Sequence, residues 1–152
     1  MINCENKPVL SIITPCYNGE KFIEDAMVSI INQKNNDIEM IIVNDGSIDD
    51  TEIVCKRYES AQIRYYQTEN HGAGFARNYG IRQAKGEWIS FLDADDLYLY
   101  KSIDNVIKKL NKSKSDIRVI VFFALLKGDF NERHYFSRRK RNEVVSLDQS
   151  HQ

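Results

Sequence analysis

Three carboxylates close the segment WISFLDADD, and their spacing suits the binding of a divalent cation. In extended backbone, side chains two residues apart point the same way, so Asp93 and Asp95 can face one site. Acids at the end of an apolar run repel one another, and an oxygen-seeking cation such as Mg²⁺ or Mn²⁺ relieves that repulsion. Asp96 is predicted to cap the helix that follows. The alternative for this cluster is a solvated acidic turn.

A second polar segment, NDGSIDD, follows the apolar residues 38–43. Ser47 and Asp50 have the spacing of a capping box, which predicts that they open a helix, and Asp49 is expected to have a structural role beside them. Asp45 precedes the box and is not needed to form it. Its carboxylate can accept a hydrogen bond from the N–H of a nucleobase ring.

Two further loops carry groups that suit a nucleotide. Tyr17 follows Pro15 in the segment PCYNG, where its ring can stack on a base; the alternative is an ordinary core or rim tyrosine. The segment NHGAGFARNYG predicts a helix whose small first residues leave N–H groups unpaired for a diphosphate, which Arg77 can also reach. This glycine pattern is weak evidence by itself because it lacks the third glycine of a dinucleotide fingerprint.

The elements between these loops must position them. Apolar runs predict strands at residues 9–14, 38–43, 63–66, 88–92 and 117–123. Helical spacing lies between the runs, for example at Phe22, Ile23, Ala26, Met27, Ile30 and Ile31. Strands that alternate with helices predict an α/β fold with a parallel sheet covered on both faces. Ligands of such sheets bind outside the carboxyl ends of the strands, so the polar loops are expected to converge there.

The composition narrows the class of protein. The 152 residues carry 21 Lys+Arg against 22 Asp+Glu, a net charge of -1, which argues against nucleic acid as a partner. Three scattered cysteines suit neither a disulfide framework nor a zinc site and favour a reducing cytoplasm. The longest apolar run, at residues 119–126, is too short to span a bilayer. A basic cluster at residues 138–141 is either solvated surface or a site of peripheral attraction to anionic lipids at the inner face of a membrane.

Taken together, the loops and strands resemble the donor-binding half of a family 2 glycosyltransferase of the GT-A fold. The matching stretches read VLSIITPCYNGEKFIEDAMVSIINQ, EMIIVNDGSIDDT, NHGAGFARNYGI and GEWISFLDADD, in this order and at fitting intervals. The resemblance implies a Rossmann-like, three-layer α/β/α domain with a mostly parallel central sheet. It places the nucleotide-sugar-binding core in residues 1–115 and the start of an acceptor-side region in residues 116–152.

The resemblance also implies a site for a nucleotide-diphosphate sugar. Pro15 and Tyr17 would line the base pocket, and Asp45 would contact the base. Arg77 would lie by the diphosphate, and Asp93 would lie near the ribose. Uridine diphosphate is the expected nucleotide, on family frequency alone.

Asp95 is the implied ligand of Mn²⁺ or Mg²⁺, which would bridge the diphosphate and assist its departure. The implied reaction is a hexosyl transfer with inversion at the anomeric carbon. The expected acceptor is a saccharide or a lipid-linked molecule, in the synthesis of a cell envelope polysaccharide or another glycoconjugate.

The resemblance does not extend to a catalytic base. Members of the family commonly continue well past the Asp-Ala-Asp-Asp loop and supply a carboxylate base there. The last part of this chain contains Asp129, Glu132, Glu143 and Asp148, but none matches that motif, so no catalytic base is assigned. The chain is therefore expected to be a fragment with low or no activity alone. The alternative is a truncated, non-catalytic nucleotide-binding or assembly module.

Overall fold

The structure is a computed structural model, and it describes residues 7–112 of the chain. Strands and helices alternate throughout this part, which confirms the α/β class. The strands are β1 (Leu10–Cys16), β2 (Ile38–Asp45), β3 (Ile63–Thr68) and β4 (Trp88–Phe91). The helices are α1 (Ile23–Ile31), α2 (Thr51–Lys56), α3 (Ala73–Gln83) and α4 (Ser102–Lys112).

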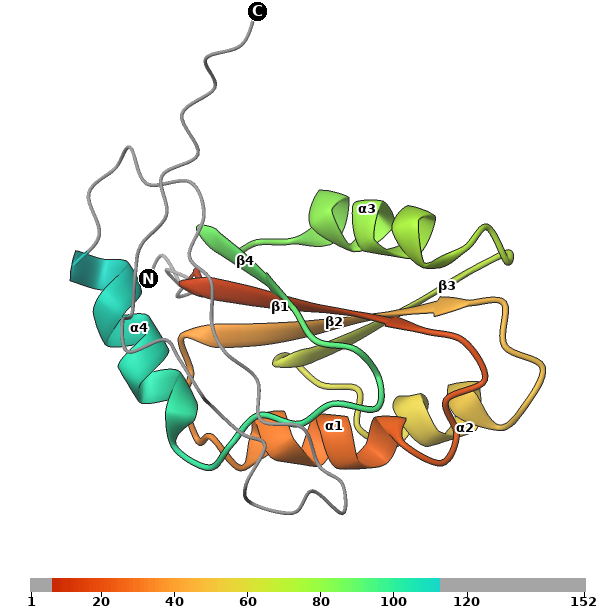
Figure 1. Cartoon of the computed structure of the whole chain (residues 1–152), viewed down its shortest axis with the longest axis horizontal. Helices are drawn as coiled ribbons and strands as arrows, with labels where there is room; N and C mark the ends of the chain where they lie inside the picture. Colours follow the sequence, from red (N-terminus) through yellow and green to blue (C-terminus); the bar gives the residue numbers. More distant parts are fainter. Residues whose placement is uncertain (1–6, 113–152) are drawn as a thin grey trace, which may run out of the picture. The chain divides into compact units, whose positions relative to one another are not determined.

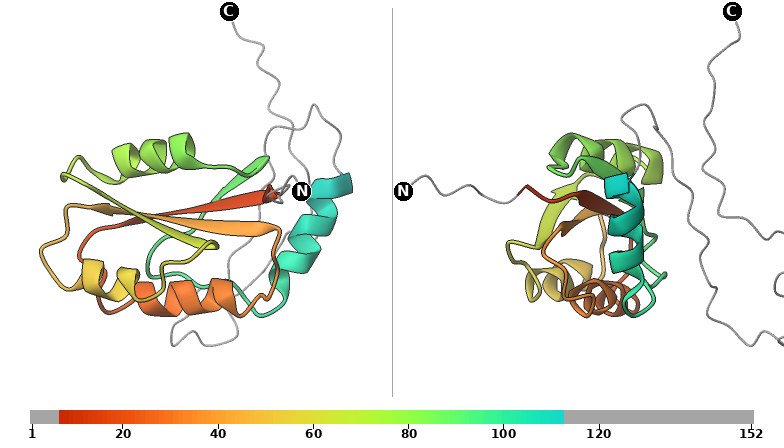
Figure 2. Two further views of the ribbon diagram at one scale, coloured as in Figure 1. Left: turned by 180° about the vertical axis from the view of Figure 1, so that it is seen from behind. Right: turned by 90° about the vertical axis from the view of Figure 1, so that its left-hand side faces the viewer.

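The strands form a parallel sheet in the order β3-β2-β1-β4. Helices α1 and α2 cover one face and α3 covers the other, which makes three layers (Figure 1; Figure 2). The crossover connections explain this order, because α1 and α2 carry the chain from β1 through β2 to β3, whereas α3 returns it to the far side of β1. The strand order therefore reverses between β1 and β4, and open α/β sheets bind ligands at such a point.

The central strands β1 and β2 are buried along their whole length because helices cover both of their faces. On the α3 face, Ile13, Ile41 and Val43 form a core cluster with Ala76 of α3. Gly80 lies one turn further along α3, and a Cβ atom there would lie 2.4 Å from Ile13 Cγ2. Helix α3 therefore rests directly on the sheet, which fixes where its first turn lies.

Helix α1 buries the apolar side chains that its spacing predicts, except at its two ends. Ile23, Ala26 and Met27 are fully buried, but Phe22 and Ile31 are 53% and 39% exposed. Phe22 is the N-cap and has non-helical backbone angles, and Ile31 is the last helical residue. The helical periodicity does not extend to residues that flank or end the helix, so these two side chains leave the buried face.

The two predicted helix caps are wrong. Helix α2 begins at Thr51, and its N-cap Asp50 makes no side-chain capping bond, so Ser47 and Asp50 do not form a capping box. Helix α4 begins at Ser102, well after Asp96, whose backbone N–H instead closes a turn after β4. In both places a turn separates the strand from the next helix, and spacing along the sequence does not reveal its length.

Several sequence-based expectations lie outside the described residues. They are the strand at 117–123, the basic cluster at 138–141, the acceptor-side region at 116–152 and the four carboxylates weighed as a base. The boundary at residue 115 therefore stays a prediction. Within residues 7–112, no helix combines the length and apolar character that crossing a bilayer requires.

Candidate functional site

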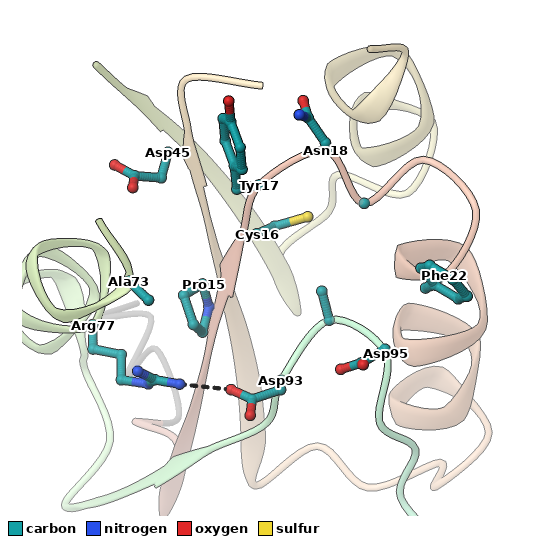
Figure 3. Close-up of a pocket in the computed structure, with 12 residues that line it drawn as sticks. Pro15, Cys16, Tyr17, Asn18, Phe22, Asp45, Ala73, Arg77, Asp93 and Asp95 are labelled. Carbon is teal, nitrogen blue, oxygen red and sulfur yellow. Dashed lines mark hydrogen bonds and ion pairs between the residues drawn. The ribbon is translucent and has the colours of Figure 1, made fainter. Parts of the chain in front are cut away.

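A pocket of about 420 Å³ lies beyond the carboxyl ends of β1, β2 and β4 (Figure 3). Its lining includes every residue that the sequence singled out for a nucleotide or a metal, namely Pro15, Tyr17, Asp45, Arg77, Asp93 and Asp95. The lining also includes residues that sequence reasoning missed, namely Cys16, Asn18, Gly19, Phe22, Ala73 and Ala94. Most of the missed residues have small or apolar side chains, which carry little chemical signal in a sequence.

The pocket opens beside the last residues of β1, where β4 no longer pairs with it. Strand β4 pairs with β1 only as far as Ile13, whereas β2 pairs with β1 to Cys16. Pro15 pairs with Val43 of β2 but lies beyond the last residue that pairs with β4, so its missing N–H costs no ladder hydrogen bond on that side. Tyr17 follows directly and is 52% exposed at the pocket lining. The chain thus places an exposed aromatic ring next to the point where β4 separates from β1.

Asp45 is buried in the wall of the pocket, and its carboxylate already accepts hydrogen bonds. Oδ2 accepts the N–H of Gly72 (2.7 Å) and Oδ1 accepts the N–H of His71 (3.0 Å). The Thr68 hydroxyl also donates to Oδ1, at 3.3 Å. Gly72 is the N-cap of α3 and has a φ of 91°, which favours glycine. Asp45 therefore holds the start of α3 in place, a structural role that the sequence did not predict.

The first turn of α3 offers a positive environment to the pocket. It contains no acidic residue, and no side chain caps it, so its N–H groups and helix dipole favour an anion. Arg77 lies one turn further on, and its Nη2 donates to Asp93 Oδ1 at 2.7 Å (Figure 3). The two side chains are 36% and 55% exposed. An ion pair this exposed is weak, so the guanidinium can be drawn away by a stronger anion.

The acid loop after β4 fits a metal that arrives with a phosphate-bearing ligand. Among residues 7–112, no cluster of three His, Cys, Asp or Glu could enclose a metal by itself. Asp95 is exposed at the pocket and forms no hydrogen bond or ion pair with another described residue. Burial, followed by the charges of Asp95 and Asp93, raises the pKa of Asp96 above its ordinary value. A divalent cation would relieve this crowding, and Mg²⁺ sites often combine one or two carboxylates with substrate phosphates.

Cys16 lines the same pocket but is unsuited to nucleophilic chemistry. Burial, with a smaller contribution from the charge of Asp49, raises the pKa of its thiol to about 11. The thiolate is the reactive form, so this cysteine is chemically quiet near neutral pH. Cys16 is therefore not a candidate nucleophile in this pocket.

The layers, the strand order and the pocket at the point of reversal agree with the GT-A fold of the similar glycosyltransferase structures. The family described as Glycosyl transferase family 2 matches residues 11–149, and the chain belongs to this family. The minor teichoic acid biosynthesis protein GgaB of Bacillus subtilis is 39% identical over an alignment of 136 positions, which covers 84% of this chain and 15% of that protein. The chain spans less than half the length of the first curated relatives that it matches.

Solved structures confirm the fold. TarS 1-349 of S. aureus, in complex with UDP-GlcNAc, is 29% identical with a TM-score of 0.64, over 68% of this chain and 31% of that one. The mannosyltransferase PcManGT of Pyrobaculum calidifontis, in complex with GDP-Man and Mn²⁺, is 26% identical with a TM-score of 0.64. That match covers 73% of this chain and 34% of PcManGT.

Proposed function

We propose that the chain is the donor-binding part of an inverting glycosyltransferase that uses a divalent metal and a nucleotide-diphosphate sugar. A UDP-sugar is the expected donor. The observation that carries the proposal is the convergence of Tyr17, Asp45, Arg77, Asp93 and Asp95 on one pocket from separate segments. The TarS complex with UDP-GlcNAc and the PcManGT complex with GDP-Man and Mn²⁺ support the ligand class. The similarity to GgaB supports an acceptor in cell envelope polysaccharide synthesis.

The nucleoside would occupy the side of the pocket between β1 and β2. Tyr17 would stack on the base, since base stacking on an aromatic ring is favourable and tolerant of sequence. Asp45 would accept a ring N–H of the base with a lone pair that its backbone partners leave available. Pro15 would complete the wall beneath the base.

The diphosphate would lie against the first turn of α3. Its charge would draw Arg77 from Asp93, because a charge-assisted contact to a phosphate is stronger than an exposed ion pair. Asp93 would then be free to accept a hydrogen bond from a ribose hydroxyl. Donor binding would in this way replace one pairing within the pocket by two contacts to the ligand.

Asp95 and the diphosphate oxygens would together hold Mn²⁺ or Mg²⁺, which when bound would offset the charge of the departing diphosphate. The acceptor oxygen would form a bond to the anomeric carbon as the bond from that carbon to the diphosphate oxygen breaks. The configuration at the anomeric carbon would invert because the incoming and departing oxygens lie on opposite sides of that carbon. The proton of the acceptor hydroxyl would pass to a general base, and no described residue is assigned to that role.

Calorimetry with UDP, GDP and dTDP, each with and without Mn²⁺, tests this proposal. The chain is expected to bind UDP most tightly and to need Mn²⁺ for that affinity. Asp95→Ala should remove the gain from Mn²⁺, because the carboxylate that holds the metal is gone. Glu87→Ala, which removes an exposed acid beside the first residue of β4, should retain the gain. If none of the three nucleotides binds, or if Asp95→Ala keeps the full Mn²⁺ dependence, the proposal is wrong.

A further inference from the structure

The loop that carries Tyr17 is tied to the loop after β2 by hydrogen bonds in both directions. Consecutive N–H groups of the first loop donate to side chains of the second loop and of the first residue of α2: Asn18 to Ser47 Oγ (2.9 Å), Gly19 to Thr51 Oγ1 (2.8 Å) and Glu20 to Asp49 Oδ2 (3.1 Å). In return, Asn18 Oδ1 accepts the N–H of Ile48 (3.0 Å) and Glu20 Oε2 accepts that of Asp50 (3.1 Å). We call this set, residues 18–20 with 47–51, the inter-loop clamp.

Asp49 is the centre of the inter-loop clamp. Besides the N–H of Glu20, its carboxylate accepts the N–H of Thr51 at 3.1 Å and the Thr51 hydroxyl at 2.5 Å. The Thr51 oxygen in turn accepts the N–H of Gly19. A charged acceptor strengthens each of these bonds. One carboxylate therefore orders both ends of the connection, directly through Glu20 and indirectly through Thr51 and Gly19.

Tyr17 depends on this support because no hydrogen bond from residues 7–112 fixes its side chain. Its ring is 52% exposed, and its hydroxyl forms no hydrogen bond within the described part of the chain. Its neighbour Cys16 is fixed in β1, whereas Asn18 has a φ of 50°, in the left-handed region that costs a side-chain-bearing residue energy. The bonds of Asn18 to Ser47 and Ile48 offset that cost. The backbone on both sides of Tyr17 is thus fixed while the ring is left open to a ligand.

We propose that Asp49 is a positioning residue of the donor site, which acts through the inter-loop clamp to hold Tyr17 where the nucleobase stacks. Asp49 does not line the pocket, so it acts on the donor through Tyr17 rather than by contact. The inference rests on the proposed function, because it assigns the base to the Tyr17 side of the pocket. It adds to that function a residue that raises affinity by ordering the site before the ligand binds.

The first test compares Asp49→Asn with Asp50→Asn in the full chain. Both variants remove one negative charge, but the Asp50 side chain makes no capping bond, and its place in the clamp is through its backbone N–H. Calorimetry with UDP and Mn²⁺ should show about tenfold weaker binding for Asp49→Asn, since the amide keeps one acceptor oxygen of the two and lacks the charge that strengthens these bonds. Asp50→Asn should bind as the wild type does.

A double-mutant cycle separates positioning from a general loss of folding. In a Tyr17→Ala background, Asp49→Asn should cause no further loss of UDP affinity, because its effect passes through the missing ring. An equal loss in both backgrounds would overturn the proposal. Thr51→Val should mimic Asp49→Asn and Thr51→Ser should restore binding, because serine keeps the hydroxyl. This pair tests the same inference if Asp49→Asn does not fold.

Hydrogen exchange of the ligand-free chain provides a readout that needs no nucleotide. The amides of residues 18–20 should exchange faster in Asp49→Asn than in the wild type. In Asp50→Asn their exchange rates should equal those of the wild type. Faster exchange with unchanged UDP affinity would overturn the positioning role and leave the proposed function intact. A wild type that shows protected amides but binds no nucleoside diphosphate would overturn the proposed function and this role together.

Discussion

At the scale of single residues, Asp45 joins the fold to the candidate ligand site. Its carboxylate accepts two backbone N–H groups at the start of α3, and it also lines the pocket. A buried carboxylate held by backbone N–H groups has a fixed direction, because rotation would leave those donors unpaired. If Asp45 also reads the base, the structural bonds pre-organise it to do so.

Asp45→Asn tests whether this residue reads the base. The variant should weaken UDP binding by about 1–3 kcal/mol, because the amide presents a donor where the carboxylate offered an acceptor. CDP lacks the ring N–H of uracil, so its binding should fall less, and the preference for UDP over CDP should shrink. Calorimetry with both nucleotides in Mn²⁺ measures this. An equal loss for the two bases would indicate that Asp45 only supports the loop at His71 and Gly72.

At the scale of elements, the close packing of α3 on the sheet makes Gly80 sensitive to substitution. A Cβ atom at Gly80 would meet Ile13 Cγ2 at 2.4 Å and Val43 Cγ2 at 3.4 Å, whereas nothing lies within 4 Å of one at Gly74 in the same helix. Gly80→Ala should lower the free energy of unfolding by about 1–3 kcal/mol through overpacking. Gly74→Ala should leave it unchanged or raise it by up to about 1 kcal/mol. Urea denaturation measures both, and equal stability of the two variants would contradict the packing argument.

A buried carboxylate also links the strands at the opposite edge of the sheet from the pocket. Glu39 of β2 accepts the Ser11 hydroxyl and the Lys85 N–H, both at 2.6 Å, and Arg64 Nη1 donates to it at 2.8 Å. Burial alone would raise its pKa, but the hydrogen bonds from Ser11, Lys85 and Arg64 together lower it below the ordinary value. The bonds join β1, β2, β3 and the segment before β4. Glu39 is therefore expected to stabilise the sheet in its ionised form.

Glu39→Gln should lower the free energy of unfolding at pH 7 by about 1–3 kcal/mol, because it weakens this buried network. The folded pKa lies below the unfolded one, so the ionised carboxylate contributes its stability above about pH 4.5 and loses it as the pH falls through the folded pKa. The difference between variant and wild type should therefore shrink in acid. Glu69→Gln, at a 94% exposed side chain, serves as the control in urea denaturation at several pH values. A constant difference down to pH 3 would argue against the ionised network.

At the scale of the whole molecule, we expect the 152-residue chain to bind donor but to transfer sugar slowly or not at all. Among the described residues, the carboxylates of the pocket already have tasks in the proposed donor complex: Asp45 holds backbone N–H groups, Asp93 is the proposed partner of a ribose hydroxyl, and Asp95 is the proposed metal ligand. None is left as a general base, whose loss typically costs about 10²- to 10⁴-fold in rate.

The release of UDP from UDP-GlcNAc by the purified chain, with Mn²⁺ and a saccharide acceptor, measures this activity. Slow release that the acceptor does not accelerate is the expected result. A non-catalytic nucleotide-binding module would give UDP binding with no release at all. Rapid, acceptor-dependent release would contradict the prediction and would make Asp129, Glu132, Glu143 and Asp148 the first residues to replace.

The sequence by itself determined the fold class, the family resemblance and the residues that would meet at one edge of the sheet. It could do so because apolar runs and helical spacing are local patterns, and a parallel sheet brings the residues that follow its strands to the same edge. Tyr17, Asp45, Arg77, Asp93 and Asp95 were identified on that basis, Pro15 was added by the family resemblance, and all of them line one pocket. Their roles in binding stay predictions.

Only the tertiary structure decided how these residues are held. The bond from Asn18 to Ser47 and that from Gly19 to Thr51 join residues 29 and 32 positions apart. Such pairings depend on distances between separate elements, which leave no periodic trace in a sequence. The same reason explains why Ser47 supports a neighbouring loop instead of capping a helix, and why the Asp49 carboxylate became the centre of the inter-loop clamp.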